Sequence, residues 1–331
     1  MKKKNVLFQI CLTLGMVGFL SFQAYAQTVP ASVSGNPVTT SNTQTAVGPF
    51  DPISTRILSD PLFLPLKGQF YGMTAYTFSD LRYDGFDAAS GVKNYNERDF
   101  IDTLSQNLAY GITNDLTLQI TESYSWERDE STTSTSSTKD TSNPTLGATY
   151  RVLDQSVYPV DVDFSGSYTP NFDINGGHTA SGLHMASLTG SVGREMKAFT
   201  VQLTGSAQYY GVEKDTSSDE RVGPYWWYSL GLNTQTRLTD RFSVNCGFTY
   251  YFPDVEKYHL TDGVAKQAWG SEMSIDTAFN YQIIPNKLVA SITYSYLPSM
   301  SVKEKYSNSS YNENINGLYG NTVGARLQYL F

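Results

Sequence analysis

Short stretches of polar and apolar alternation recur along most of the chain. FTVQLTGSAQYY (199–210), FSVNCGFTYYF (242–252) and KLVASITYSY (287–296) all follow this rule. Successive side chains of a strand point to opposite faces of a sheet, so each stretch predicts a strand with one apolar and one polar face. Such strands are expected over residues 68–78, 101–112, 115–126, 144–153, 158–169, 184–194, 198–210, 225–238, 241–252, 268–283, 287–297 and 320–331.

The links between these expected strands alternate strictly in length. Short links such as TND (113–115) and LTDR (238–241) alternate with long polar loops such as 127–143. Barrels of the bacterial outer membrane have short periplasmic turns and long external loops. A closed barrel also satisfies every backbone polar group in lipid and leaves no sheet edge. The predicted fold is therefore an all-β, antiparallel, up-and-down transmembrane barrel of about twelve strands.

Composition supports a barrel in lipid over a soluble sandwich. The polar rows consist mainly of Ser, Thr, Asn and Gln, whereas a soluble sandwich usually exposes charged residues. The 24 Tyr, 17 Phe and 4 Trp gather where strands meet loops, as in the aromatic girdles of membrane barrels. After residue 26, no apolar run approaches the ~20 residues that a transmembrane helix needs.

The N-terminal region predicts export. Residues 1–26 carry three lysines, an apolar run and an A-Y-A site, the layout of a cleaved secretory signal peptide. Cleavage leaves Cys246 as the only cysteine, which excludes an intramolecular disulfide. It also leaves 20 basic against 31 acidic residues, a balance of −11 that argues against nucleic acid as a partner.

Residues 27–63 form a low-complexity segment ahead of the barrel domain, which is expected over 64–331. The first part is rich in Ser, Thr, Val and Pro and is expected on the periplasmic side. DPISTRILSDPLFLP (51–65) is more apolar. It can either fold into the lumen as a small plug or simply lead the chain to the first strand, and we favour the lead-in.

The last strand is expected to pair with the first and close the sheet. Its apolar row ends on Leu327, Tyr329 and Phe331. This ending resembles the C-terminal signature of bacterial outer-membrane barrels. By that resemblance the three residues form an assembly signal that the barrel-assembly machinery reads.

Charged residues stand out on the otherwise neutral polar rows. Arg151 and Asp161 flank one short turn, so they are expected to pair. Two interpretations stay open: salt bridges that fill a narrow barrel, which we favour, and a polar constriction that selects solutes. Glu122 lies on the lipid row and is expected at headgroup level or beside a bulge, in preference to a lateral opening or an oligomer contact. The lumen candidates are Arg151, Asp161, Asp163, Arg237, Glu272, Asp276 and Arg326.

Catalysis has weak support in the sequence. Only His178, His184 and His259 offer a general base of the usual kind. A Ser/His/Asp set is conceivable around the loop that holds Asp173, with Ser181 and Ser187 nearby. No nucleophile elbow and no metal-ligand spacing appears. We therefore expect no enzyme activity, no cofactor and no bound metal.

Three segments carry a family resemblance: YGITNDLTL (110–118), NPTLGATYRVL (143–153) and LPLKGQF (64–70). They resemble the outer-membrane barrels of the MetA-pathway of phenol degradation family, which are described as transporters. The expected function is a monomeric channel in the Gram-negative outer membrane, in contact with lipid and lipopolysaccharide, that passes small molecules, hydrophobic or aromatic ones included. A structural or surface-binding barrel with a closed lumen is the alternative, and an outer-membrane hydrolase is the third hypothesis.

Overall fold

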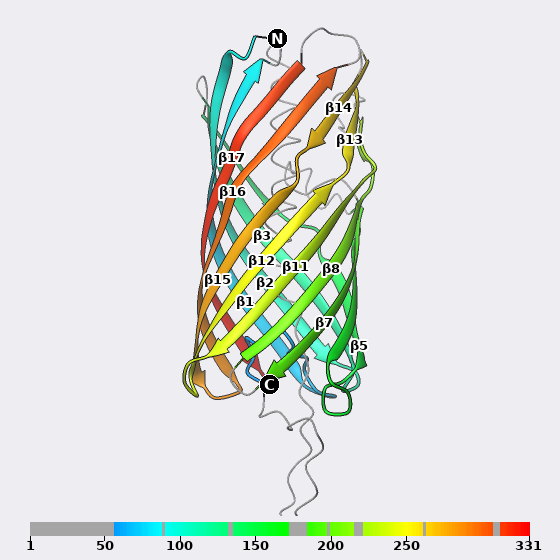
Figure 1. Ribbon diagram of the computed structural model, residues 1–331, viewed down its shortest axis with the longest axis vertical. Helices are drawn as coiled ribbons and strands as arrows, with labels where there is room; N and C mark the ends of the chain where they lie inside the picture. The colour runs from blue at the N-terminus through cyan, green and yellow to red at the C-terminus, as the bar shows by residue number, and fades with distance from the viewer. Residues whose placement is uncertain are drawn as a thin grey trace, which may run out of the picture.

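The computed structural model describes residues 56–87, 90–131, 135–171, 184–196, 199–214, 221–260, 263–306 and 312–331. The expected signal peptide and most of the low-complexity segment lie outside these residues. Figure 1 shows a barrel of tilted strands. Its wall consists of β1 (Phe70–Asp87), β2 (Lys93–Gly111), β3 (Leu116–Ser131), β5 (Thr145–Leu153), β6 (Asp161–Thr169), β7 (Met185–Met196), β8 (Phe199–Tyr210), β11 (Tyr225–Arg237), β12 (Phe242–Pro253), β15 (Glu272–Ile284), β16 (Leu288–Tyr306) and β17 (Asn312–Leu330).

The wall is closed and antiparallel. Each wall strand pairs with the preceding and following one, and β1 pairs with both β2 and β17. At the seam Tyr71 lies opposite Leu330, and the backbone N–H of Phe331 donates to the carbonyl oxygen of Phe70 at 2.8 Å. The prediction of a closed twelve-stranded barrel is confirmed. No helix among the described residues is long and apolar enough to cross a membrane.

The two faces of the wall follow the predicted alternation. On β8, Leu203 faces outward and is 55 % exposed, whereas its neighbour Gln202 faces the lumen and is 3 % exposed. Inward hydroxyl groups bond from strand to strand, as between Ser167 and Ser187 at 2.6 Å and between Thr149 and Ser165 at 2.9 Å. The inner surface is thus a hydrogen-bonded polar lining, and the outer surface is apolar.

Short turns close the end of the barrel that we assign to the periplasm, and four of them lie within the described residues. In two of them a threonine hydroxyl organises the turn: Thr113 accepts the backbone N–H of Leu116 at 2.9 Å, and Thr239 accepts that of Phe242 at 3.0 Å. Asn286 adopts a φ of 57° in the last turn, a conformation that asparagine tolerates better than most residues.

The opposite end contains more strand than the sequence analysis expects. β1, β2, β16 and β17 continue far into segments that were expected as loops, and they rise above their neighbours in Figure 1. Main-chain pairing persists there although neither face meets lipid, so the sequence shows no regular alternation of apolar and polar residues. The same end holds the short strands β4 (Thr135–Thr141), β9 (Glu213–Lys214), β10 (Arg221–Val222), β13 (Val255–Leu260) and β14 (Gly263–Trp269).

The expected assembly residues lie along the closing seam. Leu327 and Phe331 face outward, and the Tyr329 ring packs edge-on against that of Phe331 at 5.2 Å. Glu122 is exposed on the outer face opposite Gln106, in an uninterrupted β2–β3 register. On the other side of β3 the register shifts by one residue, from Thr121 opposite Thr145 of β5 to Tyr124 opposite Thr141 of β4, so the expected bulge lies beside Glu122.

Candidate functional site in the lumen

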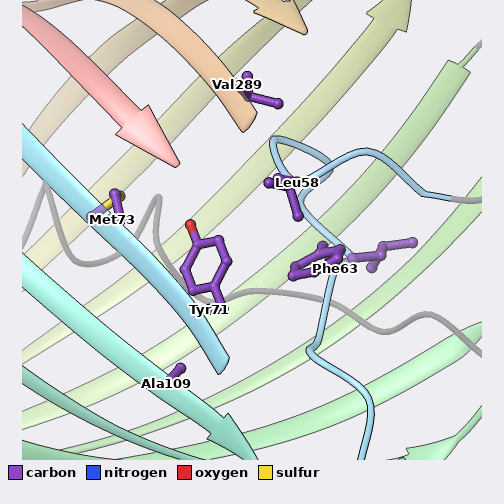
Figure 2. Close-up of a cluster of buried hydrophobic side chains, with 7 residues drawn as sticks. Leu58, Phe63, Tyr71, Met73, Ala109 and Val289 are labelled. Carbon is purple, nitrogen blue, oxygen red and sulfur yellow. The ribbon is translucent and has the colours of Figure 1, made fainter. Parts of the chain in front are cut away.

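A short segment before the first strand lies inside the barrel. Residues 56–64, called the plug from here on, have every side chain except Pro61 buried. Figure 2 shows Leu58 and Phe63 on this segment, facing wall residues. The Phe63 and Tyr71 rings are 5.6 Å apart. For these residues the plug arrangement is found, in place of the favoured lead-in. The apolar cluster comprises Leu58, Leu62, Phe63, Tyr71, Met73, Ala109 and Val289.

The plug holds its own shape through a tight turn at Asp60. The Asp60 side chain accepts the backbone N–H of Leu62 at 2.9 Å, and its carbonyl accepts that of Phe63 at 3.1 Å. The N–H of Asp60 donates to the carbonyl of Ile57 at 2.9 Å. Asp60 precedes Pro61, and an aspartate with a neighbouring proline is typical of such turns. The turn presents the Leu62 side chain and carbonyl to the wall.

An ionic network joins the plug to the wall. Its members are Arg56, Arg151, Arg237, Asp60, Asp161, Asp163 and Glu195. Arg56 of the plug bonds to Asp161 at 2.5 Å and to Glu195 at 3.0 Å, and its Nη1 donates to the Leu62 carbonyl at 3.0 Å. Burial alone lowers the pKa of Arg56, but the acids around it raise the pKa above its ordinary value. Arg56 therefore remains a cation that anchors the plug.

Wall arginines complete this network. Arg151 binds both carboxylate oxygens of Asp163, at 2.7 and 2.9 Å, lies 3.3 Å from Asp161, and donates to the Leu62 carbonyl at 3.1 Å. Arg237 bonds to Glu195 at 2.7 Å. Buried charges persist only when they are paired and hydrogen-bonded, so this network stays intact only while its members remain in place.

Amide side chains of the wall bind the plug backbone. Each donates a hydrogen bond to a polar atom of the plug, so the wall contacts the segment much as a binding site contacts a peptide. The four bonds are Gln202 to the Pro61 carbonyl at 3.1 Å, Gln235 to the Ser59 hydroxyl at 3.1 Å, Asn245 to the Ser59 carbonyl at 2.8 Å and Gln328 to the Leu58 carbonyl at 3.1 Å.

A small cavity lies beside the plug at mid-barrel. It is lined in part by Ser59, Pro61, Asn233, Asp276 and Arg326, and its volume is about 40 Å³. A water molecule needs roughly 10–15 Å³ of such space, so the cavity holds a few waters but no organic solute.

Inward aromatic residues form a cluster nearer the external end, which we call the aromatic mouth. The ring centroids of Tyr210 and Tyr225 are 4.6 Å apart, and those of Trp227 and Trp269 are 5.7 Å apart. Glu272 lies opposite Tyr251 across the β12–β15 pair. The members are Tyr210, Tyr225, Trp227, Tyr251 and Trp269, all of them buried.

The seven predicted lumen residues all face inward, but they lie at three different heights along the barrel axis. Four join the network around the plug, where the expected pairing of Arg151 with Asp161 is present. Asp276 and Arg326 line the small cavity, and Glu272 borders the aromatic mouth. Sequence reasoning missed Arg56, Asp60 and Glu195. Glu195 lies an even number of residues from the inward Ser191 on the same strand, and this alternation could have identified it. No periodicity marks Arg56 and Asp60 in the plug.

The conceivable Ser/His/Asp set is not assembled within the described residues. The His184 Nδ1 atom lies 2.6 Å from the Tyr168 hydroxyl on the exposed side of the wall. Ser187 instead bonds to Ser167 in the lumen. His178, Asp173 and Ser181 lie outside the described residues. The absence of enzyme activity stays a prediction.

Comparison with known proteins identifies the fold. No family model matches the chain, and no curated protein matches it. The crystal structure of the COG4313 outer membrane channel from Pseudomonas putida F1 is similar, with a TM-score of 0.56 at 15 % identity over 81 % of this chain and 97 % of that chain. A Pseudomonas aeruginosa FadL homologue gives a TM-score of 0.40 at 10 % identity over 79 % of this chain and 90 % of that chain. The chain has the fold of a bacterial outer-membrane barrel.

Proposed function

We propose that this protein is an outer-membrane channel for the passive passage of small molecules, and that the plug closes it at the periplasmic end. The wall behind the plug carries the observation that supports this function. Gln202, Gln235, Asn245 and Gln328 bind the plug through amide groups that water can satisfy equally well when the plug leaves. A barrel whose lumen stayed permanently closed would not need a wall surface that water can solvate.

The aromatic mouth supports aromatic or hydrophobic solutes as the cargo. Flat aromatic side chains that face a lumen offer stacking surfaces to a flat solute, and such contacts contribute about 0.5–1.5 kcal/mol each. The resemblance to the MetA-pathway family agrees with this choice. The COG4313 protein supports the channel function alone, since it is an outer membrane channel. In this proposal the buried ion network holds the plug in place and does not filter ions.

The remaining elements of the proposal follow from the barrel in lipid. The protein acts as a monomer in the outer membrane of a Gram-negative cell, is exported with a cleaved signal peptide, and is folded by the barrel-assembly machinery through Leu327, Tyr329 and Phe331. A closed structural or surface-binding barrel remains the competing function, because the plug fills the lumen in the described state.

Flux into liposomes tests the channel and its cargo together. Purified protein in vesicles is expected to admit a small aromatic solute faster than a polar solute of equal size. Trp227→Ala should reduce the aromatic flux about 2- to 10-fold, as expected for the loss of one stacking contact. Trp226→Ala is the matched control, since that neighbouring side chain faces outward and is exposed.

Two results would contradict the proposal. Equal flux of aromatic solute into vesicles with folded protein and into empty vesicles would remove the channel and favour the structural barrel. Equal losses in the Trp226 and Trp227 variants would assign the effect to barrel stability and remove the aromatic mouth from the cargo path.

A further inference from the structure

Three carboxylates meet inside the external half of the barrel, on two adjacent strands. Asp99 of β2 and Glu127 and Asp129 of β3 are buried, with exposed fractions of 2 %, 3 % and 9 %. One oxygen from each side chain can be chosen so that all three lie within 4.8 Å of one another. None of these residues contacts the plug network or the aromatic mouth in any described hydrogen bond or ion pair.

The register places two of these charges in direct opposition. Asp99 pairs across the strands with Asp129. Like charges directly opposite each other destabilise a sheet. Glu97 adds a fourth carboxylate on the same face and accepts a hydrogen bond from the Tyr83 hydroxyl. Such an arrangement is costly unless something positive or protonated occupies it.

The neighbouring arginines do not provide this charge. Arg98 stands between Glu97 and Asp99 on β2, so its side chain points to the outer face. It bonds there to Asp80 at 2.6 Å. Arg128 alternates with the acids of β3 and pairs with Glu130 at 3.3 Å, where both side chains are about half exposed. Within the part of the chain that the structure describes, the acidic cluster therefore has no arginine or lysine in ion-pair contact.

Glu127 gives a second and independent sign that a ligand is missing. Both of its carboxylate oxygens are buried, and neither forms a hydrogen bond of good geometry within the described residues, although Asp129 and Thr138 lie close to the carboxyl group. One oxygen of Asp129 is in the same state, while the other accepts the Ser136 hydroxyl at 2.8 Å. A buried carboxylate without partners is energetically unfavourable, and a metal ion that its oxygens coordinate removes this penalty.

We propose that Asp99, Glu127 and Asp129 bind a divalent cation, with calcium preferred over magnesium. Calcium takes 6–8 oxygen ligands at about 2.3–2.6 Å, so ligands on opposite sides of the ion lie about 4.6–5.2 Å apart. The three oxygens lie within 4.8 Å of one another, so they are close enough together to bind one calcium ion. Carboxylates on two strands leave the other coordination positions to water, and calcium accepts such irregular geometry more readily than magnesium does.

The bound ion would join β2 to β3 above the lipid, where no apolar row fixes the strands. It would also balance two of the four carboxylate charges in this part of the lumen. No metal was expected from the sequence, because no metal-ligand spacing appears in it. Only the register of β2 against β3 brings Asp99 to Asp129.

Calcium titration of the refolded full-length protein in detergent tests the site. Refolding from inclusion bodies removes lipopolysaccharide, which could itself bind divalent cations. Calorimetry with calcium alone should show one ion per chain, and calcium should raise the unfolding temperature relative to EDTA. Glu127→Gln should weaken binding at least about 10-fold, by analogy with losses at the supporting shells of metal sites.

Glu130→Gln is the matched control. It makes the same charge change three residues along β3 but on the outer face, so calcium affinity should stay within 2-fold of wild type. Asp129→Asn serves as a second ligand variant if Glu127→Gln fails to give a heat-modifiable barrel. Both variants carry wild-type backbone pairing, so a folded sample of either decides the matter.

Three results would overturn the proposal. Absence of calcium binding to folded wild-type protein at neutral pH would mean that the carboxylates hold protons instead. Wild-type affinity in the Glu127 and Asp129 variants would place the ion elsewhere. Tighter binding of magnesium alone than of calcium would remove the calcium preference. None of these results depends on whether solutes pass through the barrel.

Discussion

Arginine in place of Ile292 should lower the free energy of unfolding of the barrel by about 2–4 kcal/mol. Ile292 is 63 % exposed on the outer face of β16, opposite Phe279 of β15 and Ala325 of β17. Its position among apolar outward side chains places it in the hydrocarbon layer, where a guanidinium loses its hydration. Denaturant unfolding of the protein in lipid vesicles measures the loss as a shift in the transition midpoint.

Thr293→Arg is the internal control for this experiment. Thr293 is adjacent to Ile292 but belongs to the inward row, where the new side chain meets polar groups and water. Its cost should be much smaller. Leu203→Arg and Thr204→Arg on β8 repeat the comparison on another part of the wall. Equal damage on both rows would show that the assigned faces, and with them the membrane-spanning architecture, are wrong.

This comparison depends on the feature that the sequence predicted best. In every wall strand one face meets lipid and the other meets a polar interior, so a side-chain period of two is enforced along the membrane-spanning length. β8 illustrates the agreement: a strand is predicted over 198–210 and observed at Phe199–Tyr210. Where the two environments differ, the alternation alone locates a strand to within a few residues.

The same reasoning explains where prediction failed. Beyond the lipid neither face of a strand meets hydrocarbon, so stretches such as KNYNERD at the start of β2 carry no alternation of apolar and polar residues and were expected as loop. The pairs β2–β3 and β16–β17 extend there through main-chain hydrogen bonds. Main-chain bonds are independent of side-chain polarity and leave no pattern in the sequence.

The plug contacts lay beyond sequence reasoning for another reason. Arg56 meets Asp161 and Glu195 across separations of 105 and 139 residues. No local rule connects such distant positions. The alternation of faces along each strand predicted that Arg151 and Asp161 face the lumen, and the short turn between them predicted that they lie near each other. Both expectations agree with the structure. The odd or even position of a residue indicates its face only within a paired strand. It carries no information on the plug, which runs through the lumen and is not a strand of the wall.

Opening of the plug should respond strongly to Leu62. This side chain is fully buried, and its carbonyl accepts hydrogen bonds from both Arg56 and Arg151. Leu62→Ala should weaken docking of the plug by about 2–5 kcal/mol. Since about 1.4 kcal/mol corresponds to tenfold in an equilibrium, the undocked fraction should rise about 30-fold or more while it remains small. Single-channel recording in a planar bilayer should show longer or more frequent open periods.

A wall variant should produce the same opening without a change in the plug. At Gly193 of β7, an added Cβ atom would come within 2.5 Å of the Leu62 side chain. Gly193→Ala should therefore displace the plug and also increase conductance. Leu230→Ala is the matched control for Leu62→Ala, because that leucine lies on the outer face of β11 and is 60 % exposed.

The three variants separate the remaining explanations. If Leu62→Ala and Gly193→Ala both fold and neither conducts more than wild type, the wall itself closes the lumen and the plug does not gate it. If Leu230→Ala opens the barrel as much as they do, general destabilisation is the cause. An increase confined to Leu62→Ala and Gly193→Ala would mean that docking of the plug through Leu62 closes the lumen. The acids of the network would keep wall partners after the plug leaves. Asp161 would still lie beside Arg151, and Glu195 beside Arg237, so the open state would leave neither acid unpaired.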